Sequence, residues 1–198
     1  MSMEVLSKKI INYALTNEYI HKEQYEEYLY ILTLILNILI TDITMLVIGV
    51  IMGMVWECIT YWLIYKVLRK YCGGFHFSTS FKCYLSSCIM CPSILIIIKH
   101  VSINVAVLTI VAMLFSIILL LLSPVEAVNK PLDEQEIRIF GKIARLLVVG
   151  VMLVYSISLI LKFYLVSKII ALSIISVALF VIAGKLELQF SHQKHRCS

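Results

Sequence analysis

His76 and Cys83 lie in a polar, glycine-containing segment between two long apolar regions. The segment runs from residue 69 to residue 83, reads RKYCGGFHFSTSFKC, and is called the 69–83 segment. A histidine near a cysteine can take the thiol proton and later return it to a leaving group, as in acyl transfer by a cysteine nucleophile. Seven residues on one straight helix span about 10.5 Å. This chemistry therefore requires the chain to bend between His76 and Cys83.

Two glycines predict that bend. Gly73 and Gly74 together lower the helical propensity by about 2 kcal/mol relative to alanine, and they let the backbone approach a substrate closely. Arg69 can hold an acidic group of a substrate through a bidentate pair, or it can anchor the end of a membrane span. Arg69, Gly73 and Gly74 are therefore candidate substrate-binding residues.

The hydroxyl residues that follow predict the start of another helix. The sequence STS at 78–80 offers N-cap residues. With Ser80 as the N-cap, Cys83 falls in the first helical turn, where the helix dipole favours negative charge. We predict a loop over 73–79 that brings the His76 ring and the Cys83 sulfur within about 4 Å of each other.

The residue types alone leave other interpretations open. A histidine and a cysteine at this spacing can be unrelated. Cys72, His76 and Cys83 could bind a metal together, although a fourth ligand with a known spacing is missing. No third residue that would orient His76 is evident, and the acidic residues of 123–142 are typical of a solvated loop. The six cysteines predict no disulfide framework. We predict neither a metal nor a cofactor.

The composition predicts a membrane protein. Hydrophobic residues make up 61% of the 198 residues, charged residues make up 15%, and the mean hydropathy is +0.97. A soluble domain has about 45–50% apolar residues. The net charge of +5 comes from basic residues that flank apolar runs, which suits anionic lipid headgroups and gives no surface for nucleic acid. We predict a single all-α polytopic domain over 1–198, with about six transmembrane helices and an amphipathic N-terminal helical segment over 1–27.

The apolar runs give the expected spans. The run 28–68 is too long for one span of roughly 20 residues, so we expect two spans with a turn at Thr41 and Asp42. A turn at Gly49 and Gly53 is the weaker alternative. A polar loop is expected over 123–142. The remaining spans are expected at 84–98, 101–122, 143–161 and 163–183.

Two other features of the 28–68 run carry expectations. Glu57 lies deep in apolar sequence, where an unpaired charge is costly, so we expect it to need a partner. The aromatic cluster of Tyr61, Trp62 and Tyr65 is typical of a membrane-interface belt.

The distribution of lysine and arginine predicts the orientation. With six spans and both termini inside, fourteen basic residues fall on the inner side and three, Lys99, Lys162 and Lys168, fall on the outer side. Cytoplasmic segments of membrane proteins carry an excess of lysine and arginine. We therefore predict that both termini, the 69–83 segment and the 123–142 loop are cytoplasmic.

The 69–83 segment also resembles a known family. Arg69, Gly74, His76 and Cys83 match the R-x4-G-x-H-x6-C pattern of the accessory gene regulator B (AgrB) membrane peptidases. The loop SPVEAVNKPLDEQE is similar to the family's polar loop after the fourth span, and length, hydropathy and span order agree over essentially the whole chain. Phe77 departs from the pattern, since a small residue commonly follows the histidine.

The resemblance implies an activity and partners. It implies a cysteine endopeptidase in the cell membrane that removes the C-terminal tail of an AgrD-like propeptide. Cys83 would form an acyl-thioester with His76 as its acid and base. Closure of a thiolactone or lactone ring would then give an autoinducing quorum-sensing peptide. The resemblance also implies a homodimer. Cys72 adds a second thiol beside the site, which bears on substrate preference.

Two alternatives belong to other functional classes. A small peptide transporter or exporter without proteolytic chemistry would predict a helix broken at mid-membrane, and Pro92 is the only candidate for such a break. A structural membrane protein would leave the glycine, histidine and cysteine of the 69–83 segment unexplained.

Overall fold

The chain folds into α-helices joined by short connections. The computed structural model describes residues 3–17, 19–75, 77, 79–126 and 133–196, with the backbone alone for 191–196. Within this part of the chain the helices are α1 (Met3–Thr16), the 3-10 helix η1 (Lys22–Gln24), α2 (Tyr25–Ile51), α3 (Val55–Cys72), α4 (Ser80–His100), α5 (Val105–Leu122), α6 (Glu134–Ile160) and α7 (Tyr164–Arg196). The predicted all-α polytopic fold class is confirmed.

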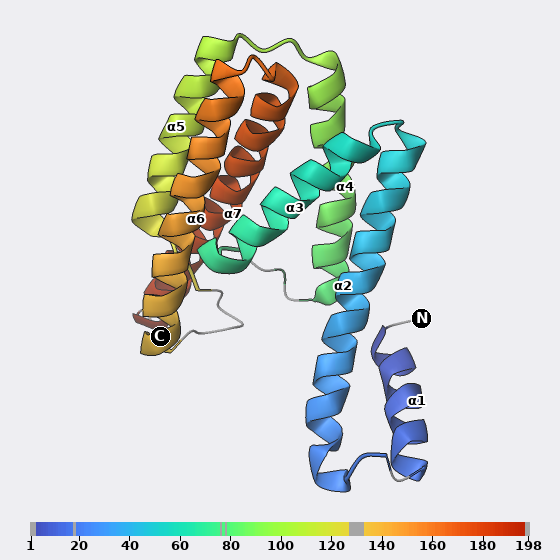
Figure 1. The fold of residues 1–198 in the computed structure, drawn as a ribbon. Helices are drawn as coiled ribbons and strands as arrows, with labels where there is room; N and C mark the ends of the chain where they lie inside the picture. Colours follow the sequence, from blue (N-terminus) through green and yellow to red (C-terminus); the bar gives the residue numbers. More distant parts are fainter. Residues whose placement is uncertain (1–2, 18, 76, 78, 127–132, 197–198) are drawn as a thin grey trace.

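The long helices form two groups with α3 between them. Helices α5, α6 and α7 stand side by side, α2 and α4 form the second group, and α3 runs obliquely from one group to the other (Figure 1). Helix α7 is the most enclosed of the apolar helices. Of the residues in its most apolar stretch 61% are buried, compared with 11% in the corresponding stretch of the segment that contains α2. Helix α7 packs against α3, α5 and α6, and therefore forms the centre of the core.

The 28–68 run contains two helices, as predicted, but the expected turn at Thr41 and Asp42 is wrong. Helix α2 continues to Ile51, and the chain turns at 52–54, where Gly53 has a φ of +65°. The weaker alternative, a turn at Gly49 and Gly53, is closer to the structure, because Gly53 lies in the observed turn. Asp42 stays inside the helix because its carboxylate has partners on α3. It lies 2.8 Å from the Lys66 Nζ and accepts a hydrogen bond of 2.8 Å from the Trp62 Nε1.

Five helices, rather than six, are long and apolar enough to cross a membrane within the described residues. The exception is α3, which has 18 residues and contains Glu57, Lys66, Arg69 and Lys70. It still runs between the two ends of the helix bundle (Figure 1). The composition of α3 therefore separates it from the other long helices, although its path does not.

The connections fall at two ends of the bundle. The turns at 52–54, 101–104 and 161–163 lie at one end, and the 73–79 connection and the C-terminal end of α7 lie at the other (Figure 1). The predicted loop over 123–142 is shorter than expected because α6 already begins at Glu134. The helix starts early since Asp133 and Glu136 form a capping box, in which each side chain binds the backbone N–H of the other.

The N-terminal segment forms the predicted amphipathic helix. Helix α1 packs along the first half of α2, with Ser7 and Ile11 buried, and this hairpin extends beyond the other helices (Figure 1). The aromatic cluster on α3 is not an interface belt, since Tyr61 is fully buried and stacks on a buried Tyr65.

Candidate active site

The predicted break between two helices is confirmed. Helix α3 ends at Cys72 and α4 begins at Ser80, and the described residues between them, 73–75, 77 and 79, are not helical. Gly73 has a φ of +69° and Gly74 a φ of +113°. Residues that carry a Cβ are disfavoured at such positive φ values, whereas glycine is not. The two glycines therefore end α3 and redirect the chain.

The backbone after α3 is held on two sides. On one side the Gly74 N–H donates to the Val125 carbonyl at 2.9 Å, and the Val125 N–H donates to the Cys72 carbonyl at 3.0 Å. On the other side the Phe75 N–H donates to the Phe180 carbonyl of α7 at 2.8 Å. The Cys72–Phe75 stretch is thus fixed between the start of the α5–α6 connection and the central helix.

The packing around this stretch leaves no room for side chains at its glycines. A Cβ on Gly73 would lie 2.1 Å from the Val125 carbonyl oxygen, and one on Gly74 would lie 2.6 Å from the Phe180 carbonyl oxygen. A Cβ on Gly184 of α7 would lie 2.4 Å from the Phe75 nitrogen. The close contact of these backbones therefore requires glycine at positions 73 and 74 after α3 and at position 184 on α7.

Arg69 joins the end of α3 to the same stretch. Its guanidinium donates hydrogen bonds to the carbonyl oxygens of Gly73 and Phe75 and lies 4.9 Å from the centre of the Phe180 ring. These contacts fix the backbone on the N-terminal side of position 76. They give Arg69 a positioning role, while its binding to a substrate stays a prediction.

Cys83 lies at the start of α4. The N-cap is Thr79 rather than the expected Ser80, since the Lys82 N–H donates to the Thr79 Oγ1 at 3.4 Å and Thr79 has extended backbone angles. The first turn holds Cys83 through a bond of 3.2 Å from its N–H to the Thr79 carbonyl. The Cys83 side chain is half-buried, and α4 begins three residues before it. A partly exposed thiol therefore lies in the first turn of a helix, where the helix dipole favours negative charge.

His76 lies outside the described residues, so the predicted approach of its ring to the Cys83 sulfur stays a prediction. The structure describes its neighbours. The rings of Phe75 and Phe77 pack edge to face, with their centres 4.9 Å apart. This contact joins the two residues on either side of position 76.

The other thiols differ from Cys83 in their surroundings. Cys72 is fully buried at the end of α3. Cys58 and Cys91 are buried in the core, with their sulfurs 3.6 Å apart, and Cys88 is half-buried on α4. Within the described part of the chain, His, Cys, Asp and Glu form no group of three or more that could hold a metal ion.

The acidic residues after α5 have structural contacts. Asp133 and Glu136 cap α6, with the Glu136 N–H donating to the Asp133 Oδ1 at 2.6 Å. Glu134 lies 4.0 Å from the Arg138 guanidinium, and Glu126 also has an interaction partner. Glu134 and Glu136 therefore belong to the first turn of α6 rather than to the expected loop.

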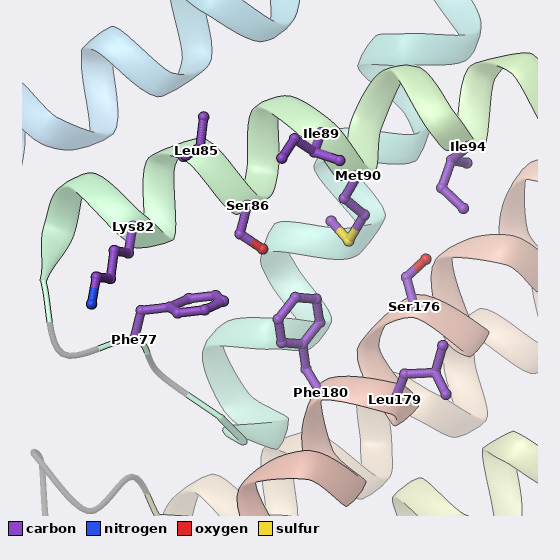
Figure 2. Close-up of a pocket in the computed structure, with 10 residues that line it drawn as sticks. All are labelled: Phe77, Lys82, Leu85, Ser86, Ile89, Met90, Ile94, Ser176, Leu179 and Phe180. Carbon is purple, nitrogen blue, oxygen red and sulfur yellow. The ribbon is translucent and has the colours of Figure 1, made fainter.

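A pocket of about 550 Å³ lies beside the 69–83 segment, between α4 and α7. One wall consists of Lys82, Leu85, Ser86, Ile89, Met90 and Ile94 of α4. The opposite wall consists of Ser176, Leu179 and Phe180, and Phe77 lies at the end near Lys82 (Figure 2). Sequence reasoning missed this pocket. The spacing of the α4 residues indicates one helix face, but nothing in the sequence pairs that face with α7.

Comparison with known proteins decides the family. The family model described as accessory gene regulator B matches residues 7–182. The chain belongs to the AgrB family. No curated protein and no solved structure gives a significant match to the chain. AgrB membership together with the apolar helices makes the chain a multi-pass membrane protein. Membership of the family also links the chain to the processing of a quorum-sensing propeptide. This propeptide, AgrD, is the partner that the family implies.

Proposed function

We propose that this AgrB-family chain is a membrane cysteine endopeptidase that removes the C-terminal tail of an AgrD-like propeptide. Cys83 is the nucleophile, and His76 is its general base and acid. The observation that carries the proposal is the placement of Cys83. Its half-buried thiol lies in the first turn of α4, directly after a connection whose other side is fixed by Arg69.

The proposed reaction has two acyl transfers. The Cys83 sulfur attacks the carbonyl carbon of the scissile peptide bond, the C–N bond breaks, and the Cys83 proton passes through His76 to the leaving amine. A thiol or hydroxyl of the retained peptide then attacks the thioester. The bond from carbon to the Cys83 sulfur breaks, a thiolactone or lactone ring closes, and the proton of the attacking group returns to Cys83 through His76.

The contacts of the 69–83 segment support separate tasks for its residues. Arg69, Gly73 and Gly74 hold the backbone before position 76 against Val125 and Phe180. Substrate binding by these three residues remains part of the proposal. Ring closure also requires that water be kept from the thioester, since hydrolysis competes with it. A site beside an apolar pocket suits this requirement.

Replacement of the nucleophile tests the proposal. Cys83→Ala is expected to abolish cleavage of an AgrD-like propeptide, while the protein still inserts into membranes. Cys72→Ala is the matched control and is expected to keep most activity, because Cys72 is fully buried. Release of the propeptide tail can be followed by mass spectrometry with purified protein in lipid vesicles. Tail release by Cys83→Ala would show that the nucleophile is another residue.

The orientation is also part of the proposal. We place both termini and the active site on the cytoplasmic side, from the fourteen-to-three asymmetry of lysine and arginine. In intact cells, an impermeant thiol reagent is expected to label a cysteine at the exposed Ser102, between α4 and α5, and to leave Ser191→Cys unlabelled. The reverse pattern would invert the topology.

The homodimer implied by the resemblance stays a prediction, and the expectation that Glu57 needs a partner inside the bundle does not support it. Glu57 does not lie deep in the bundle. It is half-buried in the first turn of α3, at the bundle end with the 52–54 turn, where the helix dipole favours a carboxylate. Crosslinking in mild detergent at low protein concentration tests the dimer, and a product at monomer size alone would contradict it.

The exporter alternative finds less support. It predicts a helix interrupted at mid-membrane, with Pro92 as the candidate. Helix α4 runs without interruption from Ser80 to His100 and contains Pro92. The Cys83→Ala experiment separates the two functions, because an exporter without proteolytic chemistry does not depend on this thiol.

A further inference from the structure

The pocket between α4 and α7 is apolar over most of its lining, and Lys82, the residue before Cys83, is part of that lining. Lys82 and Phe77 stand at one end, and Ile94 stands twelve residues further along α4 (Figure 2). Twelve helical residues correspond to about 18 Å. The pocket is therefore long enough for several side chains of an extended peptide.

Cys83 shares a helix face with the α4 wall of the pocket. Ser86 and Met90 lie three and seven residues after Cys83, and residues at these spacings fall on one side of a helix. Both line the pocket. A peptide whose carbonyl reacts at Cys83 can therefore continue along this face into the pocket.

We infer that this pocket is the specificity pocket for apolar side chains on the acyl side of the scissile bond. The inference rests on the proposed function, since it concerns the same site. The acyl part must remain in place after the tail leaves, whereas the tail must depart. Apolar walls would hold the acyl part through the hydrophobic effect and keep water from the thioester.

The charge at the mouth of the pocket fits this assignment. Among the described residues of the pocket lining, Lys82 is the one basic residue, and it precedes Cys83 in the chain. Its ammonium group suits a carboxylate of the departing tail rather than the retained apolar part. The apolar part of the pocket is therefore assigned to the retained residues, and the end with Lys82 to the departing tail.

Alkylation of Cys83 by peptidyl chloromethyl ketones tests the pocket without the natural substrate. The probes carry leucine, glycine or aspartate next to the ketone, and peptide-level mass spectrometry follows alkylation at Cys83. The leucyl probe is expected to react at least about tenfold faster than the glycyl probe, the lower range of selectivity that an apolar pocket provides. Iodoacetamide carries no amino-acid side chain that the pocket could bind. Its rate of alkylation at Cys83 therefore reports whether the thiol remains accessible.

Two pocket-filling variants and one control complete the test. Leu179→Trp and Ile89→Trp enlarge side chains that line the pocket from opposite walls and are 54% and 61% exposed, so neither overpacks the core. Ile96→Trp is the control, since Ile96 is 50% exposed on α4 and lies outside the pocket lining. The preference for leucine is expected to fall to about threefold or less in either filled variant, and to persist in the control.

The outcomes separate this inference from the proposed function. Equal rates for the leucyl and glycyl probes in the unaltered protein would overturn the pocket assignment. So would a preference that survives in both filled variants, or one that is lost in Ile96→Trp as well. Each of these results is compatible with Cys83 as the nucleophile. Cleavage of the propeptide by Cys83→Ala would overturn the proposed function, whatever the alkylation rates are.

Discussion

The two sides of the 69–83 segment are built differently. On the α3 side, Gly73 to Phe75 are fixed by backbone bonds to Val125 and Phe180 and by the Arg69 guanidinium. On the α4 side, Thr79 and Ser80 are exposed, and Phe81 is 70% exposed. One side is determined by tertiary packing, and the other by the local start of a helix.

This difference suits a site that must be both ordered and accessible. Backbone that is enclosed and hydrogen-bonded opens rarely, whereas an exposed helix end has few contacts to lose when it moves. The α3 side can keep the chain before position 76 in place, and the α4 side leaves the Cys83 thiol open to a peptide. Substitutions should therefore have large effects before His76 and small effects at the exposed residues Thr79 to Phe81.

Outside the proposed catalytic pair of His76 and Cys83, the largest expected effect is that of Gly73→Ala. The new methyl group would overlap the Val125 carbonyl, and overpacking of this kind costs about 1–3 kcal/mol. The backbone angles at Gly73, φ +69° and ψ −147°, are close to a region that almost only glycine occupies, and this adds about 1–3 kcal/mol for a residue with a Cβ. We expect loss of propeptide cleavage and a lower melting temperature in detergent, measured by tryptophan fluorescence.

Gly53→Ala is the matched control for Gly73→Ala. Gly53 has a similar φ of +65°, but no atom lies within 4 Å of an added Cβ. This variant tests a positive φ without the overlap, so its cleavage rate is expected to stay near that of the unaltered protein. If both variants lose activity equally, the close contact with Val125 is not the cause.

Arg69→Lys should have the next largest effect, and it distinguishes positioning from substrate binding. Lysine keeps the positive charge but lacks the planar fork that reaches two carbonyls. Loss of a hydrogen bond to a charged group costs about 1.5–3 kcal/mol, so kcat is expected to fall about tenfold or more with KM little changed. A rise in KM at constant kcat would instead indicate that Arg69 holds the substrate. Lys70→Gln, an exposed neighbour on α3, is the control.

The part of the site that could be predicted from sequence is the part set by local chemistry. Consecutive glycines end a helix and hydroxyl residues start one, so the 73–79 connection was expected where it is found. The N-cap was misplaced by one residue, because Thr79 and Ser80 are both good caps and only the backbone angles distinguish them. The partners of the glycines were not predictable, since Val125 and Phe180 are distant in sequence.

The same distinction explains the error in the fold. Asp42 in an apolar run suggests a turn when the chain is read locally, because a buried carboxylate needs a partner. That partner, Lys66, lies one helix further along, and the pair allows α2 to continue. Helical spacing similarly defines the α4 wall of the pocket, whereas the α7 wall depends on how two helices meet. Local composition predicted where helices begin and end, and tertiary contacts decided the rest.

The smallest expected effect is that of Thr79→Ala, which acts on the exposed side of the segment. The Thr79 hydroxyl caps α4 through the Lys82 N–H, in a long bond of 3.4 Å. Loss of an N-cap costs about 0.5–2 kcal/mol, and the length of this bond points to the lower end. The first turn of α4, which carries Cys83, should fray more often, so kcat is expected to fall about twofold to threefold without a change in melting temperature.

Asp133→Ala is the matched control, because it removes a cap of the same kind from a helix that carries no proposed catalytic residue. The Asp133 carboxylate accepts from the Glu136 N–H at 2.6 Å, so its loss should cost α6 at least as much helix stability as Thr79→Ala costs α4. If fraying near Cys83 matters, only Thr79→Ala lowers kcat, and Thr79→Ser restores it by restoring the cap. Equal losses in both variants would mean that the first turn of α4 has no special role. A loss as large as that of Gly73→Ala would mean that the exposed side of the 69–83 segment is as constrained as the packed side.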